Sequence, residues 1–229
     1  MWPAFLCGMI WQILQFMPQE WSFAKQLTDP LTTAFILIGA WRYNRLHSAE
    51  AKTLLAALVL FVIAGAIFAF LPFSYFIAGL AVFLLAHVVL CAINFNRLRA
   101  ACRSGCRPRL FMVILAAICY IGLVGFVLQT VLPQVRDAVL ANAIAAYTAV
   151  ITVMAISAAV VAAARYQSRW WWAAIGGGMM AISDACLALR MFGGMSEAWV
   201  GYAIMPLYWG GIICYVASVT PARQKNKAS

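Results

Sequence analysis

Long apolar stretches constrain this chain most, because they recur from one end to the other and leave little room for anything else. Hydropathy predicts eight helices, with approximate limits at 2–18, 22–41, 53–71, 73–96, 110–132, 138–164, 170–192 and 198–219. Most approach the length of about 20 apolar residues with which an α-helix crosses the hydrocarbon core of a bilayer. We therefore predict an all-α fold, a polytopic transmembrane bundle of eight helices that forms a single domain over residues 1–229.

The composition excludes other classes of protein. Hydrophobic residues make up 66% of the chain and charged residues 10%, and the mean hydropathy is +0.93. Soluble domains carry far more charge, and disordered chains are poor in apolar residues. The net charge of +10 does not indicate nucleic acid, because the bases lie between apolar stretches and not on a soluble face. The first stretch lacks a basic segment before it, so we expect no cleaved signal peptide.

The basic residues predict the orientation of the bundle. With eight spans, thirteen of the sixteen Lys and Arg residues fall on the side that holds both termini. They are Arg42, Arg45, Lys52, Arg97, Arg99, Arg103, Arg107, Arg109, Arg165, Arg169, Arg223, Lys225 and Lys227. Cytoplasmic loops are enriched in Lys and Arg. We therefore expect both termini in the cytoplasm of a multi-pass protein of a bacterial-type inner membrane.

Histidines and cysteines argue against a metal site. Five of the seven cysteines fall in apolar stretches, where they act as small hydrophobic residues. Cys102 and Cys106 lie in an Arg-rich loop without a further ligand nearby. The only histidines are His47 and His87, so a three-histidine zinc site cannot form. We expect neither a metal nor another cofactor.

Asp184 is the most unusual polar residue. It lies inside the apolar run 170–192 and is the one acid that cannot be placed at a helix end or in a loop. A carboxylate in hydrocarbon costs several kcal/mol, so membrane proteins rarely keep one without a use. An ion pair with Arg190 is the structural alternative, but a separation of six residues puts the two side chains on different faces of a helix. We interpret Asp184 as functional.

Four further polar residues reach similar membrane depths. Counting along each predicted helix places His87, Tyr147 and Tyr208 near the middle of the bilayer and Asp29 on its outer side. We predict that Asp184, His87, Tyr147 and Tyr208 line one cavity, with Asp29 at its outer mouth. Each also has a structural interpretation. Asp29 before Pro30 fits a helix start, His87 can bond a carbonyl oxygen, and the tyrosines can be core aromatics.

The order of several short motifs resembles a known family. The run from Phe76 to His87 resembles the F-x-x-G-L-x-x-F-x-x-A-H signature of the YhhN-like lysoplasmalogenase family. Pro30-Leu31-Thr32-Thr33 resembles its P-L-T-T segment, and Ser183-Asp184 its late S-D motif. The remaining matches are Tyr147 with Met154, Phe192 and Tyr208.

This resemblance implies a hydrolase of membrane lipids. Characterised members have eight helices and cleave the vinyl ether bond of lysoplasmalogens, which gives a fatty aldehyde and a glycerophospho-head group. It implies that Asp184 is the general acid and that His87 orients it or manages the water. Tyr147, Tyr208 and Ser183 would contact the lysophospholipid.

The chain also departs from the family pattern. Asp29 replaces a Lys, Ala66 follows Gly65 where the family has an Asp, and Leu90 and Ile212 replace polar residues. Asp29 is a candidate to replace the missing carboxylate. Two alternatives stay open. One is a non-catalytic lipid-binding protein on the same scaffold. The other is a transporter with Asp184 as proton relay, which the lack of an internal repeat disfavours.

Overall fold

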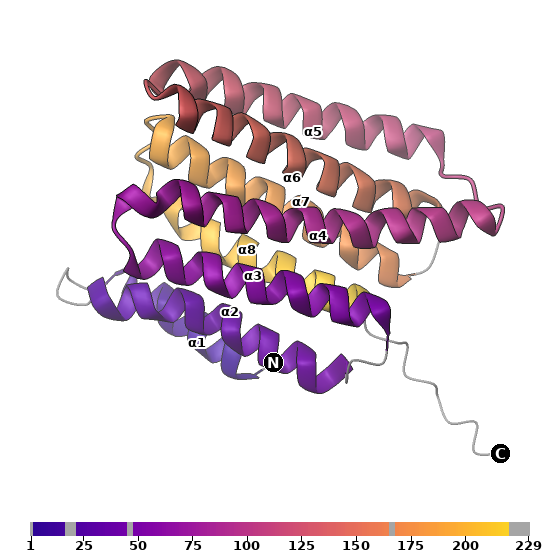
Figure 1. Ribbon diagram of the computed structural model, residues 1–229, viewed down its shortest axis with the longest axis horizontal. Helices are drawn as coiled ribbons and strands as arrows, with labels where there is room; N and C mark the ends of the chain where they lie inside the picture. The colour runs from indigo at the N-terminus through magenta and orange to yellow at the C-terminus, as the bar shows by residue number, and fades with distance from the viewer. Residues whose placement is uncertain (1, 17–21, 45–47, 165–167, 220–229) are drawn as a thin grey trace.

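The computed structural model is a bundle of α-helices that run side by side and alternate in direction (Figure 1). It describes residues 2–16, 22–44, 48–164 and 168–219, and these form eight α-helices and no strands. They are α1 (Trp2–Leu14), α2 (Ser22–Asn44), α3 (Ala49–Phe70), α4 (Phe76–Arg103), α5 (Leu110–Val131), α6 (Ala138–Ala164), α7 (Ser168–Phe192) and α8 (Ala198–Val219). Single turns of 3-10 helix, η2 (Phe73–Tyr75) and η3 (Leu132–Gln134), join two of the pairs. The predicted all-α bundle of eight helices is confirmed.

Six of these helices, α3 to α8, are long and apolar enough to cross a membrane. The protein is therefore a multi-pass membrane protein. Helix α1 has 13 residues, which is about 20 Å at 1.5 Å per residue and shorter than a hydrocarbon core. Helix α2 is long enough, but Lys25, Gln26 and Asp29 lower its hydropathy.

The helix ends differ from the predicted limits where polar residues continue a helix. Helix α3 begins four residues earlier than predicted, because the Ser48 hydroxyl accepts a hydrogen bond from the Ala51 amide at 3.0 Å and caps the first turn. Helix α4 runs on from residue 96 to Arg103. Arg97 is therefore not a loop residue as predicted, but a buried one.

Helix α4 buries a column of polar side chains that is stabilised by neighbouring helices. Asn94 donates hydrogen bonds to Ser157 and to the Tyr215 hydroxyl, at 3.1 and 3.2 Å. Arg97 donates to Glu50 at 3.1 Å and to the Ser218 hydroxyl at 3.1 Å. A buried guanidinium group is costly without partners. The contacts with Glu50 and Ser218 therefore explain how Arg97 can be buried inside the bundle.

Helices α7 and α8 approach each other most closely through two glycines. A Cβ atom added to Gly176 would lie 2.6 Å from the Gly211 carbonyl oxygen, and one added to Gly211 would lie 2.8 Å from that of Gly176. Small residues allow such backbone contact between helices in membranes. Helix α5 lies at the edge of the bundle against α6 and α7 (Figure 1).

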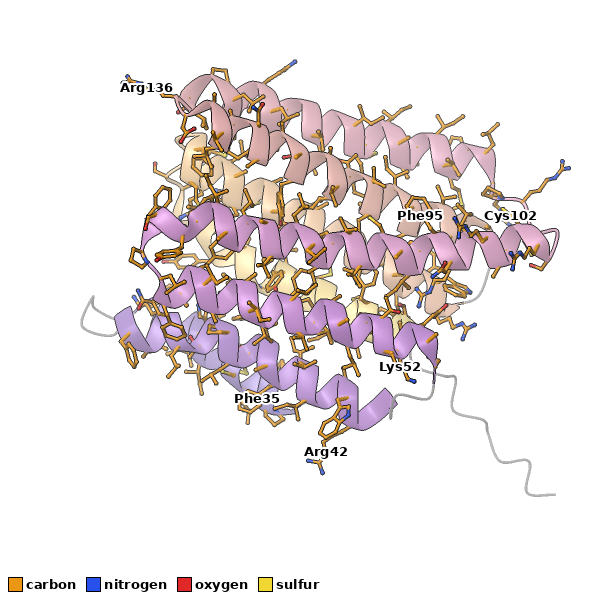
Figure 2. The ribbon with its side chains drawn as sticks, viewed as in Figure 1. Phe35, Arg42, Lys52, Phe95, Cys102 and Arg136 are labelled. Atoms are coloured by element: carbon orange, nitrogen blue, oxygen red, sulfur yellow. The ribbon has the colours of Figure 1, made fainter. Side chains whose placement is uncertain are left out.

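The two ends of the bundle differ in charge. Arg42, Lys52 and Cys102 lie at one end, with the Arg-rich turn that follows α4, and Arg136 lies at the other (Figure 2). The turn between α3 and α4 lies at the Arg136 end (Figure 1). Part of the charge asymmetry behind the predicted orientation is thus present among the described residues, whereas Arg45, Arg165, Arg223, Lys225 and Lys227 lie outside them. The side that faces the cytoplasm stays a prediction.

Candidate functional site

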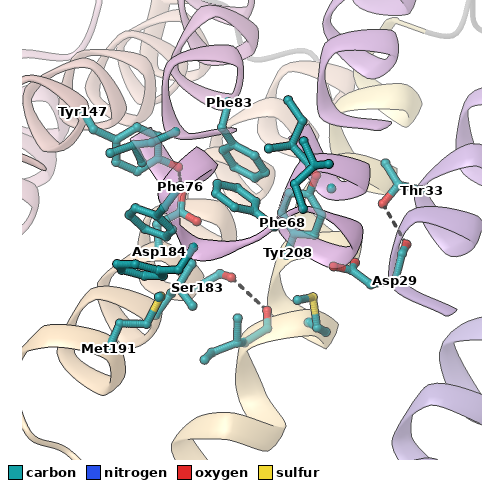
Figure 3. Close-up of a pocket in the computed structure, with 18 of the residues that line it drawn as sticks. Asp29, Thr33, Phe68, Phe76, Phe83, Tyr147, Ser183, Asp184, Met191 and Tyr208 are labelled. Atoms are coloured by element: carbon teal, nitrogen blue, oxygen red, sulfur yellow. Dashed lines mark hydrogen bonds between the residues drawn. The ribbon is translucent and has the colours of Figure 1, made fainter. Parts of the chain in front are cut away.

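A cavity of about 380 Å³ lies among six helices, α2, α3, α4, α6, α7 and α8. It reaches the turn between α3 and α4, where Leu71, Pro72 and Phe73 form part of its wall. Most of its lining is apolar (Figure 3). The polar side chains on it are Asp29, Thr33, Tyr147, Ser183, Asp184 and Tyr208.

Asp184 lies on α7 at one side of this cavity and is 9% exposed. Its Oδ2 atom accepts a hydrogen bond from the Tyr147 hydroxyl at 3.1 Å. The preceding residue, Ser183, donates its hydroxyl to the Ile204 carbonyl oxygen at 2.8 Å, which links α7 to α8 (Figure 3). Asp184 is therefore held in position between α6 and α8.

His87 lies behind the wall of the cavity and does not line it, contrary to the prediction. The rings of Phe83 and Tyr147, which line the cavity, pack against His87 with centroids 5.3 and 5.6 Å from that of its imidazole. His87 is fully buried, and its Nε2 atom lies 3.7 Å from Asp184 Oδ2. The prediction that His87 and Asp184 lie close together is thus correct. The prediction that His87 lines the cavity is wrong.

The hydrogen bonds of His87 fix its tautomer. Its Nδ1 atom lies 2.9 Å from the Phe83 carbonyl oxygen. A carbonyl can only accept, so Nδ1 carries the hydrogen, and in the neutral ring Nε2 is left with a lone pair. Nε2 has no hydrogen-bond partner among the described residues. At 3.7 Å, Nε2 is just beyond hydrogen-bond distance of Asp184 Oδ2, and a small shift of either side chain would let Nε2 accept a hydrogen bond from a protonated Asp184.

Asp29 lies on the same cavity, on α2. Its interpretation as a helix start is wrong, because α2 begins at Ser22 and Pro30 lies inside the helix. The indole N–H of Trp209 lies beside the Asp29 carboxyl group without a well-aligned hydrogen bond. Tyr208 lies between Asp29 and Asp184 and is close to both (Figure 3). Two carboxyl groups from different helices thus share one cavity.

Helix α3 meets α2 beside Asp29. Gly65 lines the cavity, and a Cβ atom added to it would be 3.9 Å from Pro30. Ala66, the position at which the sequence lacks an acid, does not line the cavity. Asp29 therefore places a carboxyl group close to Gly65, next to the position on α3 where the family has an acid and this chain has Ala66.

Sequence reasoning missed most of the aromatic lining. Phe68, Phe73 and Phe76 pack together in the wall of the cavity, next to the turn between α3 and α4. Gly79 allows this, because a Cβ atom there would lie 2.6 Å from the ring of Phe68. The sequence motif could have indicated this lining. Its spacing puts Phe76, Gly79 and Phe83 on one face of α4. In the described part of the chain, no three His, Cys, Asp or Glu side chains gather closely enough to hold a metal ion.

Fold and cavity together define a class of protein, a polytopic helical membrane protein whose mostly apolar cavity is lined by two carboxyl groups, one of them beside a buried histidine. The model of the YhhN family matches residues 24–219, and the chain belongs to that family. No curated protein and no solved structure matches the chain.

Proposed function

We propose that the protein hydrolyses the vinyl ether bond of lysoplasmalogen-type lysophospholipids, with Asp184 as general acid. The observation that carries this proposal is the position of Asp184. Its carboxyl group faces a mostly apolar cavity, accepts a hydrogen bond from Tyr147 and lies 3.7 Å from His87 Nε2. Membership of the YhhN family agrees with it.

The surroundings of Asp184 suit a proton donor. Apolar surroundings disfavour a charged carboxylate, and such a group stays neutral and keeps its proton near neutral pH. The vinyl ether reaction begins when a proton is transferred to the carbon that is β to the ether oxygen. This forms a C–H bond and leaves an oxocarbenium ion at the α carbon. Asp184 supplies that proton, and the resulting carboxylate stabilises the cation beside it.

The second carboxyl group completes the reaction. Water adds to the α carbon and gives its proton to Asp29, which forms a neutral hemiacetal. Asp29 then returns this proton to the glycerol oxygen as the C–O bond breaks, and Asp184 takes the hydroxyl proton. The products are one aldehyde and one alcohol, and both carboxyl groups regain their starting state. His87 is a positioning residue for Asp184, and Tyr147, Tyr208 and Ser183 hold the acid and the substrate.

The test is turnover of lysoplasmalogen by the purified protein in detergent or vesicles. Asp184→Asn keeps the size of the side chain but removes its proton, so we expect kcat to fall on the order of 10²–10⁴-fold. Asp137→Asn is the matched control. Asp137 accepts from the Val139 amide at 2.8 Å outside the cavity, and Asn caps a helix as well as Asp. No turnover by the native protein would refute the hydrolase.

A non-catalytic lipid-binding protein is the second candidate, favoured by Ala66 at the position where the family has an acid. It predicts that lysolipids bind to the native protein and to Asp184→Asn alike, and that neither cleaves them. Equilibrium binding of a non-hydrolysable alkyl ether lysolipid, measured beside turnover, separates the two candidates.

A further inference from the structure

A smaller crevice adjoins the cavity and lies between α5, α6 and α7. Its open volume is about 60 Å³. The crevice and the cavity share six lining residues, which are Phe76, Leu80, Tyr147, Asp184, Leu187 and Met191. Asp184 and its partner Tyr147 thus stand at the junction of the two spaces.

The crevice is apolar along its length. Thr148 and Thr152 line it, but their hydroxyl groups donate to carbonyl oxygens of their own helix at 2.6 and 2.7 Å. Apart from these, the Tyr120 side chain and the junction pair, the lining consists of aliphatic side chains and two phenylalanines. A ligand in the crevice therefore finds hydrocarbon around it and few polar groups.

The shape of the crevice comes from α7 and α5. Helix α7 contributes Ala181, Ala185 and Ala188, whose side chains end at Cβ and leave a groove. Helix α5 covers this groove loosely. Of its 22 residues, all of them described, only Val127 and Val131 are buried. The crevice is thus bounded by the least buried of the long apolar helices, next to the lipid of the membrane.

We infer that this crevice takes up the single hydrocarbon chain of the lipid substrate, with the bond to be cleaved beside Asp184 at the junction of the two spaces. The inference rests on the proposed function. In an alkenyl lysolipid, the vinyl ether joins the glycerol oxygen to the first chain carbon, so the bond to be cleaved lies at the boundary of head and chain. Asp184 lies at the corresponding boundary of the protein. The crevice is much smaller than the cavity, so we expect it to take one chain and not two.

The experiment is photolabelling with a non-hydrolysable probe. The probe is an alkyl ether lysoglycerophosphocholine that carries a diazirine near the end of its chain, and the labelled peptides are mapped by mass spectrometry. We expect label on crevice residues such as Tyr120, Leu123 and Thr152. Label confined to the Phe68 wall of the large cavity, or to lipid-facing side chains such as Phe111, would overturn the inference.

A pair of matched substitutions tests the site further. Ala188→Phe fills the crevice, and we expect crevice labelling to fall on the order of tenfold, the scale of an overpacked site. Ala146→Phe makes the same change on α6 at an exposed position outside both spaces, and labelling should stay as in the native protein. Equal labelling of both variants would contradict the inference.

A third variant covers the case in which Ala188→Phe does not fold. Leu123→Ala widens the crevice, so labelling by a probe with a methyl branch in its chain should rise relative to the native protein. An unchanged preference for the unbranched probe would count against the crevice. None of these measurements needs turnover. Labelling in the crevice without hydrolysis would refute the proposed hydrolase activity but not the chain-binding crevice. Hydrolysis with labelling elsewhere would refute the chain-binding crevice but not the hydrolase activity.

Discussion

Two carboxyl groups that approach one cavity from different helices are the feature that most needs a physical explanation. Asp184 on α7 has Tyr147 and His87 beside it, and Asp29 on α2 has Trp209 and Tyr208. Asp184 accepts a hydrogen bond from Tyr147, and the cavity on which both acids lie is mostly apolar. Two ionised carboxylates in such a place would repel each other, so we expect one neutral and one charged carboxyl group. This division is what a general acid and a general base require.

Asp29→Asn tests the role of the second carboxyl group. Asn keeps the size and the hydrogen-bonding capacity but cannot take a proton from water. We expect kcat on lysoplasmalogen to fall on the order of 10²-fold, with little change in binding of the alkyl ether lysolipid. The measurement is steady-state turnover beside equilibrium binding, with Asp137→Asn as control. Full activity of Asp29→Asn would leave Asp29 with a structural role only.

Ala66→Asp tests whether Asp29 replaces the acid that this chain lacks on α3. If Asp29 is already the working base, a further carboxyl group perturbs it, and turnover should stay level or fall. The double variant Asp29→Asn with Ala66→Asp should then regain part of the activity lost by Asp29→Asn. Turnover that appears only when Ala66→Asp is present would mean that the native chain is a degenerate, lipid-binding member of its family.

At the level of the helices, hydropathy could predict the fold because six of the eight helices, α3 to α8, are long and apolar. The limits at 138–164 and 198–219 agree with α6 and α8. Prediction failed where tertiary contacts override composition. Arg97 continues α4 because Glu50 and Ser218 bind its guanidinium, contacts that no local pattern contains. His87 lies behind Phe83 and Tyr147 for the same reason. Counting along a helix gives depth in the membrane, but not which neighbour covers a side chain.

The contact between α7 and α8 gives a prediction about stability. Ala has a higher helix propensity than Gly, so Gly→Ala normally stabilises a helix. At Gly176 the added methyl group meets the Gly211 carbonyl oxygen, and we expect Gly176→Ala to lower the free energy of unfolding by about 1–3 kcal/mol. Gly122→Ala on α5 is the matched control, since nothing lies within 4 Å of a Cβ there. Thermal unfolding in detergent should separate the two variants, and equal melting temperatures would contradict the close contact.

For the whole molecule, the orientation decides from which side the cavity is reached. Its wall at Leu71, Pro72 and Phe73 belongs to the turn between α3 and α4, which lies at the Arg136 end, away from the Arg-rich turn that follows α4. If that turn faces the cytoplasm, as the positive-inside rule predicts, the cavity is reached from the outer half of the bilayer.

Native Cys102 makes this orientation testable, because it is exposed at the Arg-rich end. A membrane-impermeant maleimide applied to intact cells should leave Cys102 unlabelled and should label it once the cells are permeabilised. Arg136→Cys provides a matched probe at the opposite end and should react in intact cells. Mapping the label by mass spectrometry keeps the other cysteines out of the comparison. Labelling of Cys102, and not of Arg136→Cys, in intact cells would reverse the bundle and open the cavity toward the cytoplasm.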